Sequence, residues 1–149
     1  MAPEPSDADY ARLLGLRTRL RGFIHWSESQ ARAAGLTPAQ HQLLLAVRGH
    51  GDPRGPTIGE VADYLYIRHH SAVELVDRAD AAGLVERIED PDDRRVVRVG
   101  LTQAGRKALR SLSEVHLDEL GRLADHLQPL LAGLDLDKDD RGGSRSANG

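Results

Sequence analysis

The chain has 149 residues and a formal net charge of −3, which fits one domain of ordinary size and no strongly basic character. It contains no cysteine, so disulfides, thiolate metal sites and cysteine nucleophiles are excluded. Aromatic residues make up 3% of the chain, so we expect a core of leucine, valine and alanine, as in packed helices. We find neither a signal peptide nor an apolar run near the ~20 residues of a membrane-spanning helix. We therefore expect a cytoplasmic protein with no membrane partner.

The first half of the chain predicts a flexible start followed by two helices. Residues 1–9 are polar and we expect them to be flexible. Residues 10–35 predict a long helix, because apolar side chains recur every three or four positions at Leu13, Leu16, Leu20 and Phe23. A second helix begins near Thr37 and Pro38, since threonine suits the N-cap and proline the first helical position. The Gly- and Pro-rich stretch 48–56 predicts an exposed loop.

Residues 57–82 predict two short helices joined by a tight turn. Thr57 and Glu60 have the spacing of a capping box, and an apolar face follows at Ile58, Val61, Ala62 and Leu65. The next helix starts between residues 69 and 71, with an inner stripe at Ala72, Leu75, Val76 and Ala79. Gly83 suits the C-terminal stop of this helix. Such a helix-turn-helix leaves its second helix free to enter a major groove.

Two strand-like segments then surround a turn. Residues 84–89 and 96–101 are rich in β-branched side chains, and residues 90–93 have turn composition. In the second segment apolar residues alternate with polar or small ones, which predicts one buried and one solvated face. The outgoing edge contains Arg94, Arg95 and Arg98, and an arginine at a hairpin tip suits a narrow minor groove.

The last long helix is predicted to begin at Thr102 and either to continue to residue 134 or to divide near Pro129. Its leucines, with those of residues 10–35, would be exposed in a monomer, so we expect both helices to be buried in a homodimer. Residues 135–149 are predicted to be disordered. The expected fold is mainly α with a small β-hairpin wing. A winged helix-turn-helix lobe, residues 36–101, lies between N- and C-terminal dimerisation helices in one domain, residues 10–134.

The most specific motif lies in the wing. After the GLVER segment at residues 83–87 comes the spacing Asp93-x-Arg95-x5-Leu101-Thr102-x-x-Gly105. This segment resembles the wing of the MarR family of bacterial transcriptional regulators, and the resemblance extends back through residues 36–40 to cover roughly residues 8–134. It implies a triangular homodimer that places two winged helices on double-stranded DNA. It also implies a chemical signal that relieves repression.

Candidate DNA contacts lie on the second helix of the motif and on the wing. Along the helix they are Arg68, the best phosphate candidate, followed by His69, His70, Ser71, Val73, Glu74 and Arg78. At the wing they are Arg94 and Arg95, with Asp93 expected to orient an arginine through a charge-assisted hydrogen bond.

Two positions on the helix have open alternatives. Val73 could contact a thymine methyl group or simply be exposed. Glu74 could accept from cytosine N4, or pair with Arg78 four residues later and contribute little.

The charge of the predicted DNA-binding lobe supports a competing function. Residues 54–106 contain eight arginines and ten acidic residues, a net charge of −2, so non-specific attraction to phosphate should be modest. The leading hypothesis is a ligand-responsive repressor that binds a pseudo-palindromic operator. The alternative is a winged-helix protein-interaction module that has lost DNA binding.

Other classes of site are disfavoured or follow only from the resemblance. The family's effector crevice lies between the dimerisation helices and the DNA-binding lobe, where a small molecule could contact Arg21, His25, Trp26 and His41. The seven histidines lack a tight ligand spacing, so neither a metal nor another cofactor is expected. No G-x-S-x-G or comparable constellation is present, so we do not expect an enzyme.

Overall fold

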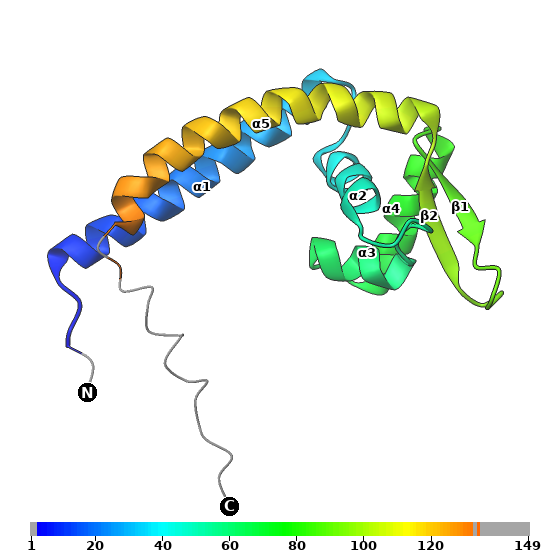
Figure 1. Cartoon of the computed structure of the whole chain (residues 1–149), viewed down its shortest axis with the longest axis horizontal. Coiled ribbons are helices and arrows are strands. Elements are labelled where there is room, and N and C mark those ends of the chain that lie inside the picture. Colours follow the sequence, from blue (N-terminus) through cyan, green and yellow to red (C-terminus); the bar gives the residue numbers. More distant parts are fainter. Residues whose placement is uncertain (1–2, 133, 135–149) are drawn as a thin grey trace, which may run out of the picture.

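The computed structural model describes residues 3–132 and 134, as a mainly helical protein with a two-stranded antiparallel hairpin (Figure 1). Two long helices, α1 (Asp7–Ala33) and α5 (Gln103–Leu131), pack along each other as an arm. The lobe at one end of the arm consists of α2 (Pro38–Gly49), α3 (Ile58–Leu65), α4 (His69–Ala81), β1 (Val85–Glu89) and β2 (Val97–Leu101). This order of elements confirms the predicted winged helix-turn-helix fold. The predicted disordered tail lies outside the described residues.

The arm differs from its prediction at both ends. Helix α1 begins at Asp7, three residues before the expected start at residue 10. The reason is a capping box, in which the Ser6 amide donates to the Asp9 carboxylate at 2.8 Å and the Asp9 amide donates back to Ser6 Oγ at 3.2 Å. Helix α5 continues through Pro129 and ends at Leu131, because a proline so near the helix end disturbs few backbone hydrogen bonds. Within the described residues, no helix is long and apolar enough to cross a membrane.

The core lies in the lobe. Its largest fully buried side chains come from α2, α3, α4 and both strands, together with the loop before α3: Leu43, Leu44, Val61, Val76, Val85, Val99 and Pro56. The arm adds only Ala31, Leu109 and Leu112 to this cluster of buried residues. The lobe is therefore the part that the single chain buries, while most of the arm's apolar surface stays exposed.

The helix-turn-helix forms from local signals that the sequence contains. Thr57 Oγ1 accepts from the Glu60 amide at 3.1 Å and the Glu60 carboxylate accepts from the Thr57 amide, which confirms the predicted capping box. Tyr66 ends α3 in the left-handed region, with φ of 54°, and its side chain is 97% exposed. The Ile67 amide then donates to the Ala62 carbonyl and turns the chain toward α4.

The wing is attached to the loop between α2 and α3. The Val99 amide of β2 donates to the Pro56 carbonyl at 2.9 Å, so the end of this loop runs along the second strand of the hairpin. Gly55 makes this approach possible, because its φ is +87° and a Cβ there would lie 2.2 Å from the Val99 carbonyl oxygen. A glycine is therefore required where the loop meets the hairpin.

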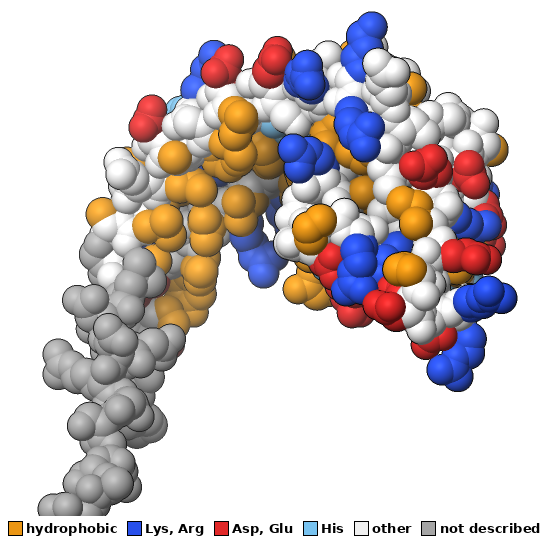
Figure 2. Space-filling view, turned by 45° about the vertical axis from the view of Figure 1, so that its right-hand side comes forward, with side chains coloured by type: hydrophobic (Ala, Val, Ile, Leu, Met, Phe, Trp, Pro, Cys, Tyr) orange, Lys and Arg blue, Asp and Glu red, His pale blue; other side chains and the backbone are white. Residues whose placement is uncertain are grey.

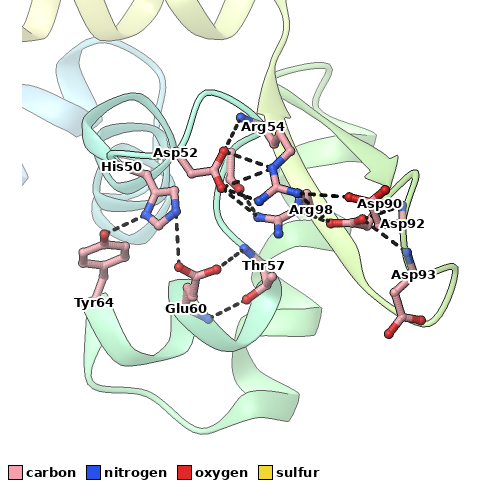
Figure 3. A network of polar contacts seen from close by, with 11 residues as sticks. His50, Asp52, Arg54, Thr57, Glu60, Tyr64, Asp90, Asp92, Asp93 and Arg98 are labelled. Atoms are coloured by element: carbon pink, nitrogen blue, oxygen red, sulfur yellow. Dashed lines mark hydrogen bonds and ion pairs between the residues drawn. The ribbon is translucent and has the colours of Figure 1, made fainter.

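A buried ion pair holds the turn of the hairpin to the same loop (Figure 3). Arg98 Nε donates to Asp90 Oδ2 at 2.7 Å, and the Arg98 and Asp90 side chains are only 11% and 5% exposed. Arg98 Nη1 also donates to the Gly55 carbonyl at 2.9 Å. The other carboxylate oxygen of Asp90 accepts from the backbone amides of Asp92 and Asp93, so the pair also shapes the turn.

Arg54 extends this pair into a cluster that we call the wing clasp: Asp52, Arg54, Asp90, Asp92 and Arg98 (Figure 3). Arg54 Nη2 donates to Asp52 at 2.8 Å, and Arg54 Nη1 lies 3.7 Å from Asp90 and 3.8 Å from Asp92. Arg98 holds the pKa of the Asp90 carboxyl below its usual range through its hydrogen bond, and the Asp92 amide lowers it further. The clasp therefore requires ionised carboxylates.

We expect Gly55→Ala to destabilise the protein by about 2–5 kcal/mol, since it adds a strained φ and a Cβ clash with Val99. Urea unfolding measures the change. The matched control is Gly49→Ala at the end of α2, where no atom lies within 4 Å of the added Cβ. Equal effects of the two substitutions would contradict the requirement for glycine at position 55.

The clasp also predicts an acid sensitivity. Because the folded-state pKa of Asp90 is depressed, its contribution to stability is full above the unfolded pKa, near 3.8, and is lost as the pH falls through the folded value. We expect Asp90→Asn to lower the melting temperature at neutral pH and to flatten its decline between about pH 5 and pH 2. The control, Asp80→Asn on the exposed face of α4, should keep the wild-type slope. Parallel curves for wild type and Asp90→Asn would argue against the clasp.

Candidate nucleic-acid interface

The leading end of α4 presents an arginine and two histidines to solvent. Arg68, His69 and His70 are exposed, and so are Glu74 and Arg78 farther along the helix. The N-cap residue Arg68 makes no side-chain capping hydrogen bond, whereas a serine or threonine caps each of the other four helices. The first-turn amides of α4 are therefore left without a side-chain acceptor, and such amides favour an anion.

Two predicted contacts on α4 are less accessible than expected. Ser71 and Val73 are half-buried, and Val73 packs against the hydrophobic core of the lobe. The sequence pattern placed Val73 outward because it lies outside the main apolar stripe. Val73 packs against the core although it lies outside that stripe, so its side chain is not fully exposed.

Glu74 and Arg78 do not interact as one alternative predicted. Among the described residues, no ion pair or hydrogen bond joins them, although they are four residues apart on the exposed side of α4. The neighbouring Asp77 instead pairs with Arg87 of β1 and ties α4 to the hairpin. Glu74 therefore remains an exposed carboxylate on the face that would meet DNA.

The tip of the wing presents two exposed arginines, Arg94 and Arg95. Asp93 accepts from the Arg95 amide at 3.0 Å and from Arg95 Nε at 3.1 Å. This carboxylate therefore restricts both the backbone between residues 93 and 95 and the direction of the Arg95 side chain. The Arg95 hydrogen bond holds the pKa of the Asp93 carboxyl below its usual range. The Arg95 side chain is nevertheless 91% exposed, so it can reach a partner.

The placement of the charges, and not their sum, allows a lobe with net charge −2 to present arginines on one face. Arg54, Arg87 and Arg98 form ion pairs with aspartates inside the lobe, and their charges hold the structure together. Sequence reasoning had grouped Arg98 with the arginines of the wing edge and did not recognise Arg54. Two features of the sequence indicate these ion pairs: the Asp52-x-Arg54 spacing in a loop and the aspartate-rich turn at residues 90–93. The exposed arginines Arg68, Arg78 and Arg94 have no acidic partner among the described residues.

The predicted effector residues separate into two groups. Trp26 and His41 meet at His116 of α5, with ring centroids 4.8 Å and 4.7 Å from the His116 ring. Arg21 and His25 are exposed on α1 and make no hydrogen bond, ion pair or ring contact with this cluster among the described residues. The spacing along α1 explains the difference, because His25 lies about 100° around the helix from Trp26.

His116 is the residue of this cluster that sequence reasoning missed. Its Nδ1 lies 2.7 Å from the Leu112 carbonyl oxygen, which can only accept, so Nδ1 donates. In the neutral ring Nε2 then accepts from the Ser27 hydroxyl at 2.7 Å, which fixes the tautomer and joins α5 to α1. Burial lowers the pKa of His41, and the nearby His116 lowers it further.

Comparison with known proteins places this geometry in a family. Residues 34–96 match the model of the MarR family. An uncharacterised HTH-type transcriptional regulator of Bacillus subtilis, YsmB, is 39% identical over 77 residues, which are 52% of this chain and 51% of that protein. The HTH-type transcriptional repressor MdtR of Bacillus subtilis is 30% identical over 110 residues, which are 66% of this chain and 68% of that protein. The chain thus spans about half the length of the first relative and two thirds of the second.

A solved structure shares the fold over most of the chain. A mutant of MarR from E. coli, complexed with operator DNA, superposes with a TM-score of 0.59 and 23% identity, covering 88% of this chain and 86% of that chain. The family match to the lobe, the relative at 30% identity and the shared winged-helix architecture agree with one another. The chain belongs to the MarR family of winged helix-turn-helix transcriptional regulators.

Proposed function

We propose that this protein is a sequence-specific transcriptional repressor that binds a pseudo-palindromic operator as a homodimer and responds to a small molecule. The observation that supports DNA binding is the placement of exposed cations at the start of α4 and at the wing tip, while the clasp and the Asp77–Arg87 pair engage acidic residues elsewhere. Repression is supported by one relative, the transcriptional repressor MdtR. Operator DNA is the ligand of the MarR structure that shares this fold.

In this proposal α4 enters the major groove with its N-terminus leading. The uncapped first-turn amides and Arg68 receive a phosphate, since a helix N-terminus attracts anions. His69 and His70 lie at the same end and reach base edges or further phosphates.

The wing makes the second contact, in the adjacent minor groove or on its phosphates. Arg95 projects from the tip with its direction restricted by Asp93, and Arg94 lies beside it without an acidic partner among the described residues. Because the wing clasp holds the hairpin to the loop before α3, the tip keeps a defined position relative to α4. Both contacts can then form at once, which a loosely attached hairpin would not ensure.

The arm supplies the dimer interface in this proposal. Figure 2 shows hydrophobic side chains gathered along the arm, and Leu14 and Leu117 are 68% and 69% exposed in the single chain. A contiguous apolar surface of this kind favours burial against a second copy. A symmetric dimer of this kind presents two α4 helices to half-sites one helical turn apart.

The effector response involves the cluster where α1, α2 and α5 meet. Trp26 belongs to α1 of the arm and His41 to α2 of the lobe, and both rings pack on His116. A ligand that contacts Trp26 and His41 would therefore touch the arm and the lobe at once. Such a ligand changes the angle between arm and lobe and so the separation of the two α4 helices. Arg21 and His25 stay candidates only for the outer rim of this site, since both are exposed.

A protein-interaction module without DNA binding is the second candidate function, and Glu74 is the observation that favours it. This carboxylate is exposed on α4 without an ion-pair partner among the described residues, and it would repel phosphate. Absence of any binding to DNA at low salt, with the protein folded and dimeric, would support this alternative and contradict the repressor.

The DNA-binding proposal predicts a defined effect of Arg95→Ala. We expect the binding free energy for a duplex containing the upstream region of the chain's own gene to weaken by about 1–3 kcal/mol. The salt slope, which is the slope of log affinity against log salt concentration, should become shallower by about one for each phosphate that the variant no longer neutralises. Fluorescence anisotropy at several salt concentrations measures both. The control is Lys107→Ala, an exposed cation on α5 outside α4 and the wing. Unchanged affinity for Arg95→Ala with an intact fold would falsify the wing contact.

The dimer proposal predicts that Leu117→Asp yields monomers, because it places a charge in the apolar surface of the arm. Sedimentation velocity measures the change in mass, and operator affinity should fall with it since one lobe reads only a half-site. Leu45→Asp is the control, because Leu45 is a similarly exposed leucine on α2, away from the arm. A dimer that survives Leu117→Asp with unchanged affinity would place the interface elsewhere.

A further inference from the structure

A cavity lies at the base of the wing. It has a volume of about 620 Å³, is open to solvent, and is lined by the end of α2, the loop before α3, both strands and the start of α5. Its α5 wall is one helix face, because Arg106, Leu109, Arg110 and Ser113 follow at spacings of three and four residues. This cavity is separate from the Trp26–His41–His116 cluster, since none of those three residues lines it.

Three guanidinium groups border this cavity without acidic partners. Arg48, Arg106 and Arg110 make no ion pair and no side-chain hydrogen bond among the described residues. Figure 2 shows Lys and Arg side chains gathered where the arm meets the lobe. All three residues are exposed and hydrated in the free protein, and an anion that enters the cavity can pair with more than one of them at once.

The remaining charged groups of the cavity are largely neutralised. Arg54 and Asp52 pair with each other in the wing clasp, and His50 contacts the Glu60 carboxylate at 3.2 Å and the Tyr64 hydroxyl at 2.8 Å. Glu86 is the one lining carboxylate that has no such partner among the described residues. Three unpaired guanidinium groups against one carboxylate leave a positive site.

The walls of the cavity are partly apolar. Val47 and Leu109 are buried at its base, and Ile88 of the hairpin is 40% exposed beside Gly100. A bare inorganic ion would leave these side chains in contact with water, whereas an organic molecule covers them. The lining therefore fits a compact organic body with its charged groups directed to the arginines.

The strand register places this cavity on the side of the hairpin opposite α4. Arg87 of β1 lies on the face that packs toward α4, since it pairs with Asp77. Glu86 and Ile88 alternate with Arg87 along the strand and line the cavity from the other face, with Gly100 opposite Glu86. The three arginines belong to α2 and α5, so none of them lies on the helix proposed to read DNA.

We propose that this cavity binds a small organic molecule with two or more negatively charged oxygens, either a phosphate ester or a polycarboxylate, held by Arg48, Arg106 and Arg110. The loop that lines the cavity also anchors the wing, because Asp52, Arg54 and Gly55 contact Arg98 or Asp90. An occupant therefore adjusts the position of the wing tip. The effect of the ligand on DNA affinity, which we call the regulatory step, rests on the proposed DNA binding. Binding of the ligand itself, the binding step, does not.

Calorimetric titration of the full chain without DNA tests the binding step. The probes are phenyl phosphate, an organic phosphate ester, and citrate, a polycarboxylate, at constant ionic strength, so that they distinguish a phosphate site from a carboxylate site. We expect saturable binding of at least one probe, weakened about tenfold by Arg106→Gln or Arg110→Gln. Lys107→Gln is the matched control, because it removes the same charge from the same helix at a position that does not line the cavity. It should leave the affinity unchanged.

Three outcomes would overturn this site. The first is that neither probe binds saturably at millimolar concentration, and the second is that all three substitutions weaken probe binding equally. The third is that the Arg106→Gln variant binds the probe normally but its affinity for DNA depends less on salt concentration. The last result would assign the arginines to the DNA interface. Anisotropy with labelled duplex then tests the regulatory step, where the bound probe should shift the duplex affinity of wild type but not of Arg106→Gln. If probe binds and DNA does not, only the proposed function fails.

Discussion

The position of the wing depends on the buried ion pair between Arg98 and Asp90. Taking both charges out of water is costly, and the cost is offset only because each group makes further hydrogen bonds, Arg98 to the Gly55 carbonyl and Asp90 to two turn amides. Removal of either partner would leave the other charge largely buried with only a longer ion pair, Asp90 with Arg54 at 3.7 Å or Arg98 with Asp52 at 3.9 Å. The pair therefore unites the hairpin turn, the loop before α3 and, through Thr57, the start of the helix-turn-helix into one body.

This arrangement changes how the acidic composition of the lobe should be interpreted. A net charge of −2 over residues 54–106 suggests a surface that repels phosphate. Arg54, Arg87 and Arg98 instead pair with aspartates that shape the hairpin, so many acidic groups are engaged within the lobe. Exposed cations remain at three places: the start of α4, the wing tip and the cavity behind the hairpin. The net formal charge describes the lobe poorly because salt screens exposed charges beyond about 8–10 Å, so the local arrangement of charges decides what a ligand meets.

Features governed by neighbours in the sequence were predicted well. The capping box at Thr57 and Glu60, the apolar faces of α3 and α4 and the hairpin turn follow from interactions over three or four residues. Errors appeared where local signals compete. The capping residue Ser6 was overlooked, so α1 begins earlier than expected, and Val73 is drawn toward the core although its helical position suggested an outward side chain.

The sequence by itself determined the family, the order of helices and strands, and which residues stand at the start of α4 and the wing tip. The tertiary structure decided which charges are available and which rings meet. Arg98 contacts Gly55 across 43 positions and Ser27 contacts His116 across 89, so no local pattern could pair them. Such contacts form only when packing of the apolar faces brings distant segments together, because the directional hydrogen bonds and ion pairs between them add little until the backbone is already in place.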